Sequence, residues 1–311
     1  MRERPWGFIL FKRNIETPTQ VSALVGELRD CVGEAGCAGA DRPGRRPGGS
    51  GSGRRIGRPI RPAPPSARST TSTRLWASRP RGLSSRLIAA DLIDLGITVD
   101  CLPLADVPVA GADAVIGNRA YGTEPAKVAA IARAVTEGLE QGGVLPVLKH
   151  IPGHGRATAD SHFRLPTVDT SRKELERTDF AAFQPLADLP MAMTAHVVFS
   201  ALDPAQPATT SATIIRQVIR GVIGFQGLLM SDDVSMNALA GSIAERTRAI
   251  VNAGCDMVLH CNGKLDEMRD VARETPELAG RGAGSRQAGA GLAQAACSRS
   301  TGRRHGLNWM R

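Results

Sequence analysis

Short apolar runs alternate with longer amphipathic segments along most of this chain. A short apolar run bounded by polar or turn residues predicts a buried strand, and an amphipathic segment of a dozen residues predicts a helix. The expected strands are residues 7–11, 97–102, 144–148, 191–195, 227–230 and 257–259. The expected helices are residues 17–31, 84–95, 125–139, 171–187, 211–219 and 243–253, with a last helix from residue 264. Thr17-Pro18 has the residue types expected at the start of the first helix.

The regular order of strand and helix predicts an α/β protein with a parallel sheet covered by helices. Polar residues cluster directly after several strands, which favours a TIM-type (β/α) barrel over a doubly wound sheet. No Gly-x-Gly-x-x-Gly follows any expected strand, and this argues against a dinucleotide-binding fold.

Two segments break the alternation. Residues 36–82 contain eleven arginines and one acidic residue, Asp41, among many glycines and prolines, and residues 282–311 are also basic and lack acids. Such compositions bury too little apolar surface to offset chain entropy, so we expect both segments to be disordered. They divide the chain into an N-terminal part of the barrel (1–35), the arginine-rich segment (36–82), the remainder of the barrel (83–281) and a tail (282–311).

The net charge of +9 comes from these segments, because the remainder of the chain carries about −7 once residues 36–82 and 281–311 are removed. An arginine-rich nucleic-acid-binding protein is thus an alternative, but the acidic remainder and the scarcity of aromatic residues near the arginines argue against it. No stretch reaches the length of a membrane span, and no signal peptide is recognised. The six cysteines contain no CxxC pair, which fits a cytoplasmic protein without disulfides.

The densest polar cluster runs from Lys149 to His162, directly after the expected strand 144–148. Its glycines and proline are typical of an irregular functional loop at the C-terminal face of a barrel. Asp160 and His162 lie two residues apart and would face the same side of an extended segment. A carboxylate beside a histidine can orient the imidazole, so this pair is a candidate proton shuttle.

A second cluster, Ser231-Asp232-Asp233-Val-Ser-Met, follows the expected strand 227–230. A carboxylate at this position can be a nucleophile or a metal ligand, and one of the two aspartates, which we expect to be Asp233, would instead cap the next helix. A third cluster places Arg119 on a loop, where an ion pair at the surface is an equally good interpretation.

Four other histidines have less specific interpretations. His150 and His154 join His162 within thirteen residues and would allow a metal site, but no acid or cysteine stands at a familiar ligand spacing, so we expect no metal or other cofactor. His196 and His260 lie between apolar residues of expected strands, which is typical of hydrogen-bonded histidines in or near the core.

These motifs together resemble bacterial β-N-acetylhexosaminidases of glycoside hydrolase family 3. Lys149-His-Ile-Pro-Gly-His-Gly with Asp160-Ser-His resembles the family's signature loop, and Ser231-Asp-Asp-Val-Ser-Met resembles its nucleophile segment. The match extends, in order, through Ile116-Gly-Asn-Arg and Met193-Thr-Ala-His-Val and covers residues 1–35 and 83–281.

The resemblance implies a retaining glycosidase that removes β-linked N-acetylglucosamine from cell-wall fragments during recycling. It assigns Asp232 as nucleophile, His162 as acid/base and Asp160 as the residue that orients His162. Arg119, Lys149 and His150 would hold the sugar, in a monomer with no nucleic-acid or membrane partner. Two alternatives stay open within this fold: a phosphorylase, and a catalytically impaired remnant.

The resemblance fails between the first and second helices. Where the family has Ile-Asp-Gln-Glu-Gly-Gly-Arg-Val, this chain has Asp41-Arg-Pro-Gly-Arg-Arg-Pro-Gly. One codon spelling of that segment, shifted by one base, encodes the family motif. We therefore interpret residues 36–82 as translated out of frame and the barrel as incomplete: its third strand region is replaced, and its first strand is absent because the chain begins after it.

Overall fold

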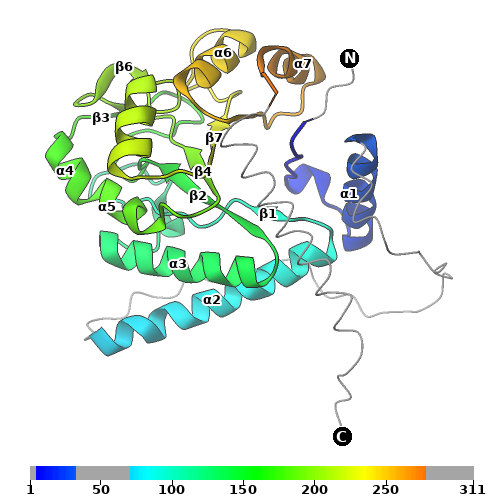
Figure 1. Cartoon of the computed structure of the whole chain (residues 1–311), viewed down its shortest axis with the longest axis horizontal. Helices are drawn as coiled ribbons and strands as arrows, with labels where there is room; N and C mark the ends of the chain where they lie inside the picture. Colours follow the sequence, from blue (N-terminus) through cyan, green and yellow to red (C-terminus); the bar gives the residue numbers. More distant parts are fainter. Residues whose placement is uncertain (1–4, 33–70, 278–311) are drawn as a thin grey trace, which may run out of the picture.

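The computed structural model describes residues 5–32 and 71–277, and its centre is a parallel sheet of five strands (Figure 1). Their order across the sheet is β1-β2-β4-β7-β8, and every neighbouring pair is parallel. The strands are β1 (Val99–Asp100), β2 (Leu145–Ile151), β4 (Met191–Thr194), β7 (Leu228–Asp233) and β8 (Met257–Leu259). Sequential strands that are parallel neighbours are typical of a (β/α) barrel.

Helices connect the strands and cover one side of the sheet (Figure 1). The α-helices are α1 (Pro18–Val32), α2 (Thr71–Asp94), α3 (Pro125–Gln141), α4 (Arg172–Arg177), α5 (Asp179–Phe183), α6 (Ile243–Ala253) and α7 (Leu265–Glu274). A π-helix, η4 (Ile214–Val222), stands where the sequence predicts an ordinary helix, and three 3-10 turns are η1 (Lys12–Asn14), η2 (Gly117–Arg119) and η3 (Gln184–Leu186). None of the described helices is both long and apolar enough to cross a membrane.

The two faces of the sheet carry different apolar clusters, because successive side chains of a strand alternate between faces. Leu148, Ala192 and Leu229 belong to the large cluster that includes residues of α3, α5 and η4. Their neighbours Val147 and Met193 belong to a second cluster on the other face, against which Trp6 packs. The three central strands, β2, β4 and β7, are therefore buried on both faces, as the continuous apolar runs of the sequence predict, whereas β1 and β8 at the edges are only partly buried.

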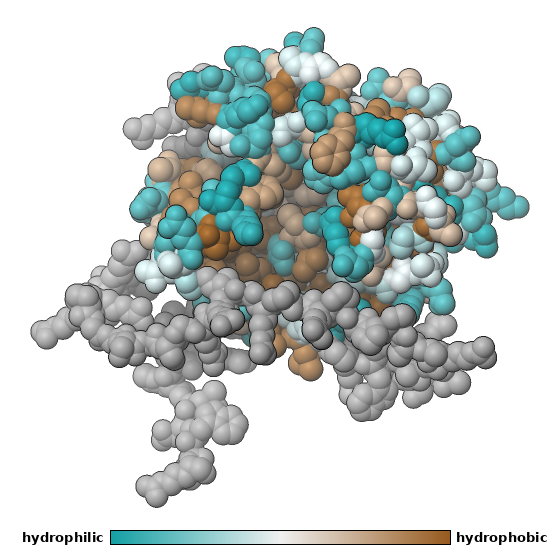
Figure 2. Space-filling model, turned by 180° about the vertical axis from the view of Figure 1, so that it is seen from behind, coloured by the Kyte–Doolittle hydropathy of each residue, from teal (hydrophilic) through white to brown (hydrophobic). Residues whose placement is uncertain are grey.

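The described strands form an open, partial barrel, as expected from the sequence. Seen from behind, the molecule has a hollow in the middle of its surface where apolar side chains gather (Figure 2). The strand expected over residues 7–11 is wrong: these residues are not in a strand, and no described strand pairs with them. Without a neighbouring strand the backbone has no ladder to join, and Phe11 N–H instead donates to the side chain of Asn14.

The arginine-rich segment is helical at its end, which corrects the expected boundary. The helix predicted over 84–95 begins at Thr71, so residues 71–82 are helical rather than disordered. α2 lies beside α3 (Figure 1), and Gly82 and Ser85 approach Gly138 of α3 closely enough to exclude a side chain there. Packing against α3 explains a helix that its own composition does not predict. The structure does not describe residues 36–70 or the tail 282–311, so the expectations for these residues lie outside it.

A small second sheet was not predicted. It consists of β3 (Thr167–Val168), β5 (Val198–Phe199) and β6 (Asp203–Pro207), with β3 parallel and β6 antiparallel to β5. Because β3 follows the loop that begins at the end of β2, and β5 follows β4, this sheet ties together the connections at the C-terminal end of the main strands.

Candidate active site

The C-terminal ends of four neighbouring strands bring charged side chains together. Asp100 ends β1, Lys149 and His150 lie near the end of β2, His196 follows β4, and Asp232 is near the end of β7. Since the strands are parallel, these residues lie at one edge of the sheet, where barrel enzymes have their active sites. Burial raises the pKa of Asp100, and the nearby charge of Lys149 offsets this only in part.

Asp232 is held as a carboxylate by its surroundings. Burial would raise its pKa, but the charges of His150 and Lys149 and a hydrogen bond from the backbone N–H of Asp233 (2.8 Å) lower the pKa below its usual value. Asp232 is therefore ionised at neutral pH, as a nucleophile or an ion-pair partner must be.

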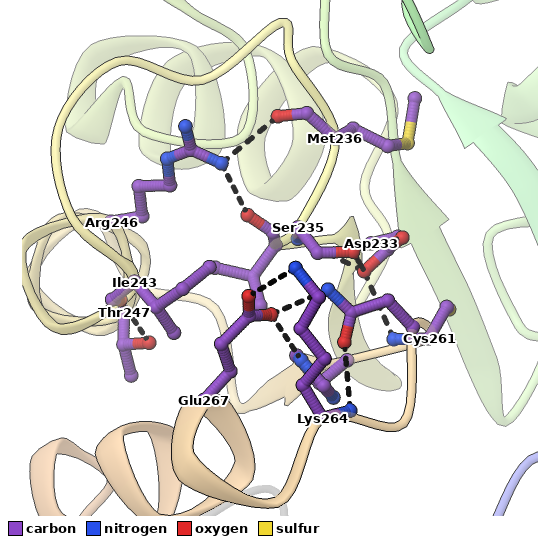
Figure 3. Close-up of polar contacts among 12 residues, drawn as sticks. Asp233, Ser235, Met236, Ile243, Arg246, Thr247, Cys261, Lys264 and Glu267 are labelled. Carbon is purple, nitrogen blue, oxygen red and sulfur yellow. Dashed lines mark hydrogen bonds and ion pairs between the residues drawn. The ribbon is translucent and has the colours of Figure 1, made fainter.

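Asp233 has a structural role, although not the one predicted. Its Oδ1 accepts hydrogen bonds from the backbone N–H groups of Ser235 and Cys261, both at 3.0 Å, so it joins the turn after β7 to the residues after β8 (Figure 3). It does not cap the next helix: Ser242 caps α6 in a reciprocal pair with Glu245. A carboxylate that faces two backbone donors in a turn is satisfied there and cannot also reach a helix start.

Asp106 is a functional candidate that sequence reasoning missed. It is fully buried, and its carboxylate accepts from His150 Nδ1 (2.7 Å), from the backbone N–H of His150 (3.3 Å) and from that of His154 (2.7 Å). Burial would raise its pKa, but His150 and His154 lower it instead. Because an ionised carboxylate only accepts, His150 carries a proton on Nδ1, which fixes the orientation of its ring.

His196 follows β4, lies near Asp232 and Asp233, and is fully buried. Burial lowers its pKa more than the neighbouring carboxylates raise it, so the ring is neutral. Nε2 is 3.0 Å from the carbonyl oxygen of Asp233 and therefore carries the proton, which leaves Nδ1 to accept from the hydroxyl of Thr209 at 2.7 Å. The prediction of a hydrogen-bonded core histidine is confirmed for His196, but no sequence pattern indicates that it lies near Asp232. His260, 2.9 Å from Glu267, is also paired.

The loop after β2 is shaped by its glycines. Gly153 has a φ of +143°, which side-chain-bearing residues rarely adopt. At Gly155 a Cβ would lie 2.1 Å from the carbonyl oxygen of Val107, so only glycine allows this backbone to approach the segment that carries Asp106. Arg156 then fastens the loop to the helices through Asp179, 2.6 Å from its Nε.

Asp160 and His162 form the pair that their spacing predicts. Asp160 Oδ1 lies 2.7 Å from His162 Nδ1 and accepts from the His162 backbone N–H at 2.9 Å. Partial burial would raise the pKa of Asp160, but the hydrogen bonds and charge of His162 lower it. The His162 side chain is 62% exposed, so its Nε2 side is accessible to a substrate.

Arg119 is a predicted site residue that makes no hydrogen bond or ion pair with the other predicted site residues in the part of the chain that the structure describes. It lies exposed on η2 and donates to the carbonyl oxygen of Val115 at 3.2 Å. Within residues 5–32 and 71–277, no hydrogen bond or ion pair joins Arg119 to the strand-end residues or links His162 to Asp232. In the same part of the chain, no group of three histidine, cysteine, aspartate or glutamate side chains is arranged to hold a metal ion.

Comparison with known proteins places this chain in a family. Residues 80–279 match the glycosyl hydrolase family 3 N-terminal domain. A "Beta-hexosaminidase" of Alkalilimnicola ehrlichii is 36% identical over 270 residues, which are 83% of this chain and 74% of that protein. The crystal structure of NagZ from Neisseria gonorrhoeae with N-trifluoroacetyl-D-glucosamine has a TM-score of 0.58 and 34% identity, and the match covers 70% of this chain and 71% of that one. A family 3 β-N-acetylglucosaminidase from Paenibacillus sp. str. FPU-7 has a TM-score of 0.70 and 26% identity, over 97% of this chain and 58% of that one.

Proposed function

Because this chain belongs to glycoside hydrolase family 3, we propose that it is a retaining glycosidase that removes terminal β-linked N-acetylglucosamine. The observation that carries this proposal is the ionised, partly buried carboxylate of Asp232 at the end of β7, beside Lys149, His150 and His196. The names of the relatives support an N-acetylhexosamine as the sugar that is released.

In the first step, Asp232 attacks the anomeric carbon of the sugar. A bond forms between that carbon and Asp232 Oδ while the bond to the glycosidic oxygen breaks, and His162, as imidazolium, gives its proton to the leaving oxygen. Asp160 stabilises this imidazolium and fixes its ring, since Oδ1 lies 2.7 Å from Nδ1. The products of the step are a glycosyl-enzyme ester and the free alcohol.

In the second step, water attacks the ester on the same face of the sugar. His162, now neutral, takes a proton from the water as the carbon–Asp232 bond breaks, and the carboxylate is restored. Two inversions at one carbon give net retention. A histidine paired with an aspartate thus does what a second carboxylate does in most glycosidases.

Lys149, His150 and Arg119 would hold the sugar hydroxyls. Support for Lys149 and His150 comes from their place beside Asp232 and from the fixed Nδ1–H tautomer of His150, which leaves Nε2 free of the Asp106 contact. For Arg119 the support is the motif alone. We further propose cell-wall fragments as substrates, with N-acetylglucosamine on anhydro-muramic acid, in a cytoplasmic monomer that has no nucleic-acid partner.

The test is the stereochemistry and identity of the first product. Proton NMR of an aryl β-N-acetylglucosaminide during turnover should reveal the β-anomer of N-acetylglucosamine before mutarotation. The α-anomer as first product would refute retention. N-acetylglucosamine 1-phosphate formed only when phosphate is present would identify a phosphorylase, and no turnover of any aryl or wall-derived substrate would favour the impaired remnant.

A further inference from the structure

The loop that carries Asp160 and His162 is buried over much of its length but has an exposed tip directly after Ser161. His162, Phe163, Arg164 and Leu165 are all exposed, and the Phe163 side chain is the most exposed large apolar group among the described residues, at 76%. Ser161, between the two members of the acid/base pair, is 3% exposed. The exposed tip has no packing of its own to hold a side chain in place, so the contact that holds the adjacent Ser161 contributes to the position of His162.

His154 is the residue that holds Ser161. Its Nε2 lies 3.0 Å from Ser161 Oγ, and both side chains are buried. Burial and the charge of His150 lower the pKa of His154, so the ring is neutral and carries one proton. Nδ1 is buried without a partner. An unpaired acceptor is less costly there than an unpaired N–H, so the proton lies on Nε2, which donates to Ser161.

The position of His154 is in turn fixed by Asp106. The carboxylate of Asp106 accepts from the backbone N–H of His154 at 2.7 Å and from the ring of His150 at 2.7 Å. The buried carboxylate of Asp106 therefore fixes the positions of both His150, which would bind the sugar, and His154, which contacts Ser161. The rings of His150 and His154 lie side by side, with centroids 5.6 Å apart.

We propose that Ser161, held by His154 and through it by Asp106, is a positioning residue for the His162–Asp160 pair. This inference rests on the proposed function for its catalytic meaning. The chain of contacts runs from the end of β2, where the sugar would bind, to the exposed tip of the loop, where the proton would be transferred. It explains why a buried serine stands between Asp160, which orients the imidazole, and His162, which transfers the proton.

The test compares Ser161→Ala with Ser200→Ala, which also removes one hydroxyl that bonds within a loop, here to Asp169 Oδ1 at 2.7 Å. We expect Ser161→Ala to lower kcat about ten- to hundredfold for alkyl N-acetylglucosaminides, whose leaving groups need a proton, and much less for a dinitrophenyl one. Ser200→Ala should leave both values unchanged. Ser161→Thr, which keeps the hydroxyl, should recover most of the loss. An equal loss for both leaving groups, or no loss, would overturn the proposal.

A second measurement needs no activity. Trypsin should cut after Arg164 several times faster in Ser161→Ala than in the wild type or in Ser200→Ala, as followed by mass spectrometry of the native chain. An unchanged rate would overturn the role of Ser161 in holding the loop. If Ser161→Ala does not fold, Ser161→Cys, with a similar volume and a weak acceptor, takes its place. An inactive wild type would refute the proposed function, while the cleavage rates would still decide whether Ser161 holds the loop.

Discussion

Alanine variants of two adjacent residues should have different effects: Asp233→Ala should lower stability, whereas Asp232→Ala should abolish catalysis. The Asp233 side chain accepts from the N–H groups of Ser235 and Cys261, both at 3.0 Å, and from the Ser235 hydroxyl at 2.7–2.8 Å (Figure 3). Asp232, by contrast, accepts one hydrogen bond from a neighbouring backbone N–H and otherwise faces Lys149 and two histidines.

The expected magnitude follows from the donors that would be left unpaired. Two backbone N–H groups lose their acceptor, and each unmet donor costs about 1–3 kcal/mol when buried. Because both are only partly buried, the lower part of that range applies, and Asp233→Ala should lower the free energy of unfolding by roughly 2–4 kcal/mol. For a chain of this size that corresponds to a decrease in Tm of roughly 5–15 °C. Asp233→Asn keeps the Oδ1 acceptor and should lose much less. Asp232→Ala should change Tm little.

The assay measures Tm and turnover of an aryl N-acetylglucosaminide for the three variants. Below the Tm of each variant, Asp233→Ala should keep kcat within about tenfold of the wild type, whereas Asp232→Ala should lose several orders of magnitude. The reasoning would be refuted if Asp233→Ala were as stable as the wild type, or if it lost as much activity as Asp232→Ala while still folded.

Three further predictions concern proton transfer, pH and the core. His162→Ala should slow alkyl glycosides by about 10²–10⁴-fold in kcat/KM and activated aryl glycosides far less; equal loss would mean that His162 only positions the sugar. Hydrogen bonding, first of all from His260, lowers the pKa of Glu267 to about 2. The ionised Glu267 therefore stabilises the fold above its unfolded pKa of about 4.5, and this stabilisation is lost as the pH falls towards 2. The difference in Tm between wild type and Glu267→Gln should decrease as the pH is lowered from 5 to 3, and a constant difference would contradict this. Phe225→Ala, which removes a fully buried side chain, should lower the free energy of unfolding in denaturant titrations by about 3–5 kcal/mol. Phe163→Ala, at an exposed position, should change it hardly at all. Similar losses of stability in both variants would be evidence against the described core.

The sequence was most informative where an apolar strand ends in polar residues. The ends of β2 and β7 were predicted to within three residues, and with them Lys149, His150 and Asp232, because a strand buried on both faces reads as an unbroken apolar run. The pairing of Asp160 with His162 was also predictable, since it depends only on local spacing.

Contacts between distant segments could not be predicted in this way. Asp106 interacts with His150 and His154 across more than forty residues, and the one signal for it was a lone carboxylate in the apolar run Leu-Pro-Leu-Ala-Asp-Val, which has to find a partner if buried. The strand expected over residues 7–11 is wrong for the converse reason: its composition favours a strand, but the described residues offer it no neighbour.

The central claim, that Asp232 forms a covalent bond with the sugar, is tested most directly by trapping the intermediate. A fluorinated N-acetylglucosaminyl substrate that hydrolyses slowly should accumulate the glycosyl-enzyme, and intact mass spectrometry should reveal one added sugar per chain. Peptide mapping should then place the sugar on Asp232, and Asp232→Ala should acquire no label. A sugar ester on any other carboxylate, or turnover of natural substrates with inversion at the anomeric carbon, would contradict the account.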